Sequence, residues 1–147
     1  MTATSHAILG TIIAAKIGNP LLAIPIAFTS HIAADLIPHW DTGTNEQMKR
    51  RKRVFIESFF DVIAGFVISF LMIQFFFPKT DMFYAFLIII VSQSLDWMTA
   101  PYYFFHIKQL KFVYDFQKKF DNGMDKPWGI INQIAVLIIV FLLAKLV

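Results

Sequence analysis

Acidic and histidine side chains recur at helical spacing inside apolar stretches of this chain. His31 and Asp35 are four residues apart, and so are Glu57 and Asp61. Each pair therefore lies on one face of a helix. Ionisable groups in apolar helices are costly and indicate a functional site. Histidine nitrogen and carboxylate oxygen are together ligands for Zn²⁺, Mn²⁺ or Fe²⁺, so the pattern predicts a divalent metal site.

Further candidate ligands are expected near the same ends of the helices. At about 1.5 Å rise per residue, His31 lies roughly 10 Å from Pro38, and Asp96 lies roughly 7 Å from Pro101. A cluster with more carboxylates than cations needs compensation in a low dielectric, and a divalent ion supplies it. We therefore expect one or two metal ions, zinc before manganese or iron, held by His6, His31, Asp35, Glu57, Asp61 and Asp96, with His39 and Asp41 as the catalytic base or supporting groups.

Long apolar stretches must position these side chains. Hydrophobic residues make up 57% of the 147-residue chain and charged residues 16%, which leaves too little polar surface for a water-soluble domain. A helix of about 20 apolar residues crosses a bilayer. The sequence predicts one all-α domain over residues 1–147, a polytopic membrane bundle of about five helices over residues 5–17, 21–37, 54–77, 81–105 and 128–146. The first stretch is short, so it is expected to be tilted or re-entrant.

Prolines and one mixed segment mark the connections. Pro20 suits the first position of the second helix, and Pro38 ends the same stretch, residues 21–37. Pro101 is expected to kink or end the fourth stretch. Residues 104–120 interleave phenylalanine with lysine. This pattern predicts an amphipathic helix on the membrane surface, which is a candidate lid over the cluster.

Basic residues gather in two of the connections. Residues 49–53 are all basic, and residues 106–126 hold five lysines, whereas the other side of the predicted bundle holds only Lys16, Lys79 and Lys145. Basic loops stay in the cytoplasm. The asymmetry predicts a cytoplasmic N-terminus and an outside C-terminus, and a re-entrant first stretch would instead put the N-terminus outside. The expected location is a bacterial inner membrane. The basic run is explained by topology and anionic lipid headgroups, and no nucleic-acid partner is expected.

The second apolar stretch also carries a resemblance to known proteins. Residues 30–41, SHIAADLIPHWD, with His6 upstream, resemble small bacterial integral-membrane metal-dependent hydrolases. The His-x-x-x-Asp element is similar to one in zinc-dependent phospholipase C. The resemblance covers about the first two-fifths of the chain. It implies that His6, His31 and Asp35 are metal ligands, with His39 as a further candidate.

Three functions remain open at this point. The leading expectation is a metal-dependent hydrolase acting on a lipid or phosphoester at the inner leaflet, because a metal with an open position activates water. The first alternative is a proton- or cation-coupled transporter that uses the same carboxylates. The second is a structural membrane protein whose polar cluster only pairs helices. The chain contains no cysteine, which excludes disulfides, thiolate metal sites and a cysteine nucleophile.

Overall fold

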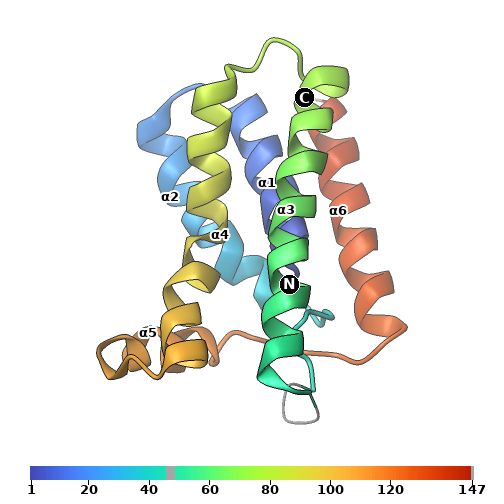
Figure 1. Ribbon diagram of the computed structural model, residues 1–147. Coiled ribbons are helices and arrows are strands. Elements are labelled where there is room, and N and C mark those ends of the chain that lie inside the picture. Colours follow the sequence, from blue (N-terminus) through green and yellow to red (C-terminus); the bar gives the residue numbers. More distant parts are fainter. Residues whose placement is uncertain (46–48, 147) are drawn as a thin grey trace.

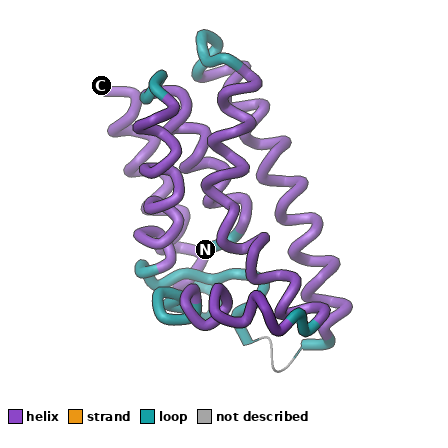
Figure 2. Tube along the Cα trace, turned by 90° about the vertical axis from the view of Figure 1, so that its left-hand side faces the viewer, coloured by secondary structure: helices purple, strands orange, loops and turns teal. Residues whose placement is uncertain are grey.

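The computed structural model describes residues 1–45 and 49–146 of the chain. Its elements are α1 (Ala3–Lys16), α2 (Pro20–Asp35), α3 (Arg51–Phe76), α4 (Met82–Phe105), the 3-10 helix η2 (Lys108–Leu110), α5 (Lys111–Gln117) and α6 (Trp128–Leu146). The predicted all-α class is confirmed. The long helices run roughly side by side, and α5 lies across one end of the bundle (Figures 1 and 2). We call this end the α5 end.

Three of the helices, α3, α4 and α6, are long and apolar enough to cross a membrane. Their outer surfaces carry most of the exposed large hydrophobic side chains, as expected for contact with lipid. α1 has 14 residues and α2 has 16, fewer than the roughly 20 that a perpendicular crossing needs. The membrane class therefore agrees with the structure, whereas the count of five crossings stays a prediction.

α1 is an interior helix of the bundle. It packs against α2, α3, α4 and α6, and it lies between α4 and α3 in Figure 1. A Cβ atom on Gly10 would collide with the Ser92 Oγ, and one on Gly65 would meet the Ala7 Cβ at 3.1 Å. Small residues let these helices approach closely. This packing leaves His6, in the first turn of α1, fully buried.

Several helix ends follow the expected local rules. Asn19 accepts a hydrogen bond from the Leu21 N–H ahead of Pro20, the first residue of α2, as predicted from the preference of proline for this position. α3 starts at Arg51, earlier than residue 54, because arginine and lysine are good helix formers. Pro101 does not end α4, which continues to Phe105. Apolar membrane helices tolerate such a proline.

The expected amphipathic helix over residues 104–120 is wrong in its extent. His106 has a left-handed backbone conformation with φ of 57°, which ends α4. The short η2 and the seven-residue α5 follow it. Because the chain turns at His106, α5 crosses the end of the bundle instead of extending α4 (Figure 1). α5 therefore lies next to the predicted ligands.

Candidate metal centre

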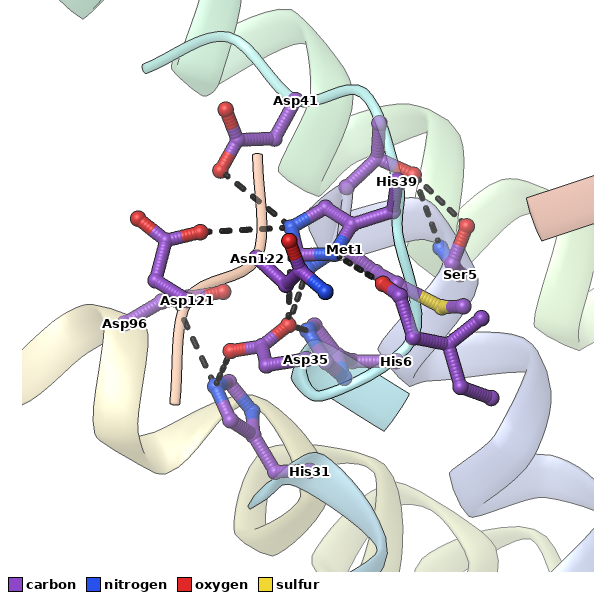
Figure 3. A network of polar contacts seen from close by, with 12 residues as sticks. Met1, Ser5, His6, His31, Asp35, His39, Asp41, Asp96, Asp121 and Asn122 are labelled. Atoms are coloured by element: carbon purple, nitrogen blue, oxygen red, sulfur yellow. Dashed lines mark hydrogen bonds and ion pairs between the residues drawn. The ribbon is translucent and has the colours of Figure 1, made fainter. Parts of the chain in front are cut away.

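Seven histidine and aspartate side chains from five parts of the chain converge at the α5 end of the bundle (Figure 3). α1 and α4 each contribute one residue, α2 contributes two, the segment after α2 contributes two, and the segment after α5 contributes one. They are His6, Asp96, His31, Asp35, His39, Asp41 and Asp121. We call this set the His/Asp cluster.

Asp35 lies at the centre of the His/Asp cluster. Its Oδ1 is 3.1 Å from the Nε2 of His6 and 3.9 Å from the Nε2 of His39. Its Oδ2 is 3.2 Å from the Nε2 of His31. Oδ1 also accepts a hydrogen bond from the amino group of Met1. The side chain is only 3% exposed, so one buried carboxylate faces three imidazoles.

The ring of His31 is fixed by its backbone contact. Its Nδ1 lies 2.7 Å from the carbonyl oxygen of Ser92, so Nδ1 carries the proton and donates it. Nε2 then points at two carboxylates, 3.2 Å from Asp35 and 3.5 Å from Asp96. Metal-binding histidines typically have one nitrogen held by a carbonyl in this way, leaving the other for the ion.

His39 has the same arrangement on the other side of Asp35. Its Nδ1 donates to the carbonyl oxygen of Ile37 at 2.8 Å. Its Nε2 lies 3.3 Å from Asp121 and 3.9 Å from Asp41, yet this buried nitrogen has no hydrogen-bond partner among the described residues. A buried nitrogen without a hydrogen bond is costly, and either a proton that pairs with these carboxylates or a metal ion would satisfy it.

His6 completes the group around His31. The two rings stack with centroids 3.7 Å apart and planes 9° from parallel. Both ring nitrogens of His6 are buried and lack a hydrogen-bond partner within the described part of the chain, because Nε2 is near Asp35 without the orientation of a hydrogen bond. The imidazole of His6 therefore has a nitrogen available to bind a metal ion, close to Asp35 of α2 and Asp96 of α4.

The distances in the His/Asp cluster suit metal coordination. Ligands about 2.1 Å from a tetrahedral zinc ion lie roughly 3.4 Å from one another. The three pairs formed by Asp35 with His31, Asp96 with His31 and Asp121 with His39 span 3.2, 3.5 and 3.3 Å. Two triads, His6–His31–Asp96 and His39–Asp41–Asp121, each have candidate ligand atoms within 4.8 Å of one another. Asp35 lies between them and contacts both.

Asp121 was not among the ligands expected from the sequence. Its position is set by backbone pairing between the segments after α5 and after α2. The Asn122 N–H donates to the Asp35 carbonyl at 3.0 Å, and the His39 N–H donates to the Asn122 carbonyl at 3.1 Å. The one available signal was an acidic residue in the polar connection before the last helix, and that signal is weak. Only the tertiary pairing places its carboxylate opposite His39.

The charges of the second triad are strongly coupled. Burial opposes a charge on His39, but the facing carboxylates of Asp121 and Asp41 outweigh it and raise the pKa of His39 to about 9. In turn, the interaction with His39 lowers the pKa of Asp121 to about 2, against the effect of burial. A proton on His39 thus compensates the carboxylates when no ion is bound. A metal ion at the same position would replace that proton.

α5 contributes a polar cover to the first triad. The Nε2 of Gln117 donates a hydrogen bond to the Oδ1 of Asp96 at 2.5 Å and lies 3.4 Å from the Nε2 of His31. Gln117 is the last residue of α5. α5 therefore contacts the first triad through Gln117, and the lid expected from the sequence stays a prediction.

Glu57 and Asp61 lie apart from both triads. Asp61 accepts hydrogen bonds from the Ala3 N–H at 2.6 Å and the Thr4 hydroxyl at 2.7 Å, at the start of α1. Glu57 pairs with Arg53 at 2.7 Å and Lys49 at 3.4 Å. The carboxyl oxygens of both residues thus have partners outside the His/Asp cluster.

A cavity of about 410 Å³ adjoins the cluster. Asp41, Asp96 and Asp121 line one part of it, and aromatic and aliphatic side chains of α3 and α4 line another. The side chains of Asp96 and Asp121 are 29% and 18% exposed, compared with 3% for Asp35. A small molecule in this cavity would therefore meet the two outer carboxylates first.

The chain matches no protein-family model, no curated protein and no solved structure. The resemblance to membrane metal-dependent hydrolases and to zinc-dependent phospholipase C therefore stays a prediction. What the structure establishes is a buried His/Asp cluster beside a cavity, in a helical bundle with three helices able to cross a membrane.

Proposed function

We propose that this chain is an integral-membrane metal-dependent hydrolase, acting on a lipid or phosphoester at the inner leaflet of a bacterial membrane. The observation that carries the proposal is the shared orientation of His31 and His39. Each ring donates its Nδ1 proton to a backbone carbonyl and directs Nε2 at carboxylates. A cluster that only paired helices would not need two imidazoles oriented in this way.

The ligand assignment follows the two triads. One ion would be held by His6, His31 and Asp96, and a second by His39, Asp41 and Asp121, with Asp35 between them. This assignment makes His39 and Asp41 ligands instead of the catalytic pair expected from the sequence. The ligands are nitrogen and hard oxygen without thiolate, which favours zinc and admits manganese or iron.

The chemistry would be hydrolysis of an ester in the adjoining cavity. A bound divalent ion polarises a phosphoryl oxygen and lowers the pKa of a coordinated water to about 7. In the reaction, a water oxygen bonds to phosphorus, the ester P–O bond breaks, and the water proton ends on the departing alcohol. Asp96 and Asp121 line the cavity, so the reacting group would bind on their side of the cluster.

The basic residues support a cytoplasmic position for this site. The run at residues 49–53 and the lysines of residues 106–126 lie at the α5 end, whereas Lys16, Lys79 and Lys145 lie at the opposite end. By the positive-inside rule the α5 end faces the cytoplasm. The same cations would attract anionic headgroups of the inner leaflet.

The test is a hydrolysis assay on detergent-purified protein loaded with zinc. Bis(p-nitrophenyl) phosphate, p-nitrophenyl phosphate and phosphatidic acid vesicles serve as substrates, with chelated protein as the blank. We expect ion-dependent turnover that falls about a hundredfold or more in His31→Ala and is unchanged in His106→Ala, a matched variant at an exposed histidine. Turnover that survives chelation would contradict the proposal. Bound metal without turnover would favour ion-coupled transport or helix pairing.

A further inference from the structure

The cavity beside the His/Asp cluster extends between α3 and α4. Phe59 and Val62 of α3 line it opposite Trp97 and Ala100 of α4. These two helices contact each other only sparsely, because α1 packs against both, and they stand apart in Figure 1. The cavity therefore has an apolar part between two membrane-spanning helices and an acidic part at the cluster.

Two aromatic contacts bound the opening between these helices. The rings of Phe55 and Phe104 meet edge to face at 5.2 Å near the α5 end. The rings of Phe66 and Trp97 lie 6.3 Å apart further along the helices. Between these contacts α3 extends for roughly 16 Å, at about 1.5 Å rise per residue. We call this opening the α3–α4 window.

The window opens on the lipid-facing side of the bundle. Phe59 is 54% exposed and Trp97 is 38% exposed, one on each side of the window. Both belong to helices that are long and apolar enough to cross a membrane. Exposed aromatic side chains at this position are stable against acyl chains and unfavourable against water. A ligand that passes through the window therefore comes from the bilayer.

We propose that the cavity takes a membrane lipid with a phosphate ester headgroup, which enters sideways through the α3–α4 window. This inference rests on the proposed metal-dependent function, because the two ions supply the positive charge that the phosphate needs. The acyl chain lies against Phe59 and Ala100, and the phosphate lies against Asp96 and Asp121 through the ions. The apolar part of the cavity thus matches the acyl chain, and its charged part matches the phosphate headgroup of the same lipid.

The test uses photocrosslinking, so that it does not depend on turnover. Zinc-loaded protein is reconstituted in phosphatidylcholine vesicles with a phosphatidic acid that carries a diazirine in its acyl chain. After illumination, labelled peptides are mapped by mass spectrometry. We expect label concentrated on residues 55–66 and 97–104, displaced by dioleoyl phosphatidic acid and not by diacylglycerol. Label spread evenly over α3, α4 and α6, with no displacement, would overturn the proposal.

A matched pair of variants tests whether the lipid enters through the α3–α4 window. Ala100→Trp fills the window, and Ala135→Trp adds the same side chain on an exposed position of α6. We expect Ala100→Trp to reduce window labelling about tenfold by overpacking, and Ala135→Trp to leave it unchanged. Unchanged labelling in an Ala100→Trp protein that keeps its metal would overturn the lateral route.

Two further readouts separate this inference from the proposed function. Equal displacement by water-soluble dibutanoyl phosphatidic acid would show access from water and overturn the lateral route. Metal content is measured on the same samples. Bound metal without specific window labelling refutes the lipid inference alone. Specific labelling without bound metal refutes the metal-dependent hydrolase and the role of the ions in holding the phosphate, and leaves only lipid entry through the α3–α4 window.

Discussion

Two carboxylates near the α5 end, the buried Asp35 and the half-buried Asp61, have opposite surroundings. Asp61 faces N–H and O–H donors at the start of α1, and these satisfy its oxygens. Asp35 faces the Nε2 atoms of three histidines, two of which lack any hydrogen-bond partner in the described part of the chain. A carboxylate with satisfied oxygens stabilises a helix start. A carboxylate surrounded by imidazole nitrogens that lack hydrogen bonds can bind a cation together with those nitrogens.

Substitution of Asp35 should cause the largest loss of bound metal. Asp35→Ala removes the carboxylate that contacts both triads, so we expect loss of essentially all tightly bound metal. The measurement is elemental mass spectrometry after gel filtration, with circular dichroism to confirm helix content. A folded Asp35→Ala protein with the metal content of the wild type would show that Asp35 is not needed to hold the ions.

Asp121 should show an intermediate effect. Asp121→Asn removes a ligand from the second triad only, so we expect about half of the metal to remain if each triad holds one ion. Asp125→Asn is the matched control, because Asp125 pairs with Asn45 outside the cluster. The metal-to-protein ratio of each variant shows whether Asp121 is a metal ligand. A full loss in Asp121→Asn would mean one shared ion, and no loss would exclude Asp121 as a ligand.

Asp61 should affect stability and not metal content. Asp61→Ala leaves the Ala3 and Thr4 donors at the start of α1 without their acceptor, which should lower the free energy of unfolding by about 1–3 kcal/mol. Denaturant unfolding in detergent measures this change. Metal loss in a protein that unfolds like the wild type would show that Asp61 is a ligand, as the sequence suggested.

Glu57 should show the smallest effect. Its carboxylate forms ion pairs with Arg53 and Lys49, and partly exposed ion pairs contribute only about 0–1 kcal/mol. We expect Glu57→Gln to keep both its metal and, within roughly that margin, its stability. Thermal unfolding and metal content are read from one preparation. A clear fall in metal content would return Glu57 to the ligand set.

Much of this arrangement follows from helical periodicity. The apolar stretches predict the helices, and the four-residue spacing of His31 and Asp35 places both on one face of α2. Depth along the helices also predicted that His6 and Asp96 approach this pair, and their distances agree with that expectation. Metal binding itself stays a prediction.

Other features depend on tertiary contacts that periodicity does not contain. Asp121 reaches His39 only because residues 122–124 pair with the backbone after α2. Asp61 differs from Asp35 because α1 begins beside it and presents free N–H groups. Residue type and spacing alone make Asp61 and Asp35 equivalent, so the sequence could not separate a helix cap from a candidate ligand.

The most direct test of metal binding by the His/Asp cluster is the metal content of the purified protein. Elemental mass spectrometry compares wild type with His31→Ala and with His106→Ala, after purification without chelators and reconstitution with zinc, manganese or iron. We predict stoichiometric metal in the wild type and in His106→Ala, and a clear loss in folded His31→Ala. Absence of metal from the reconstituted wild type, or equal metal in all three proteins, would contradict this prediction.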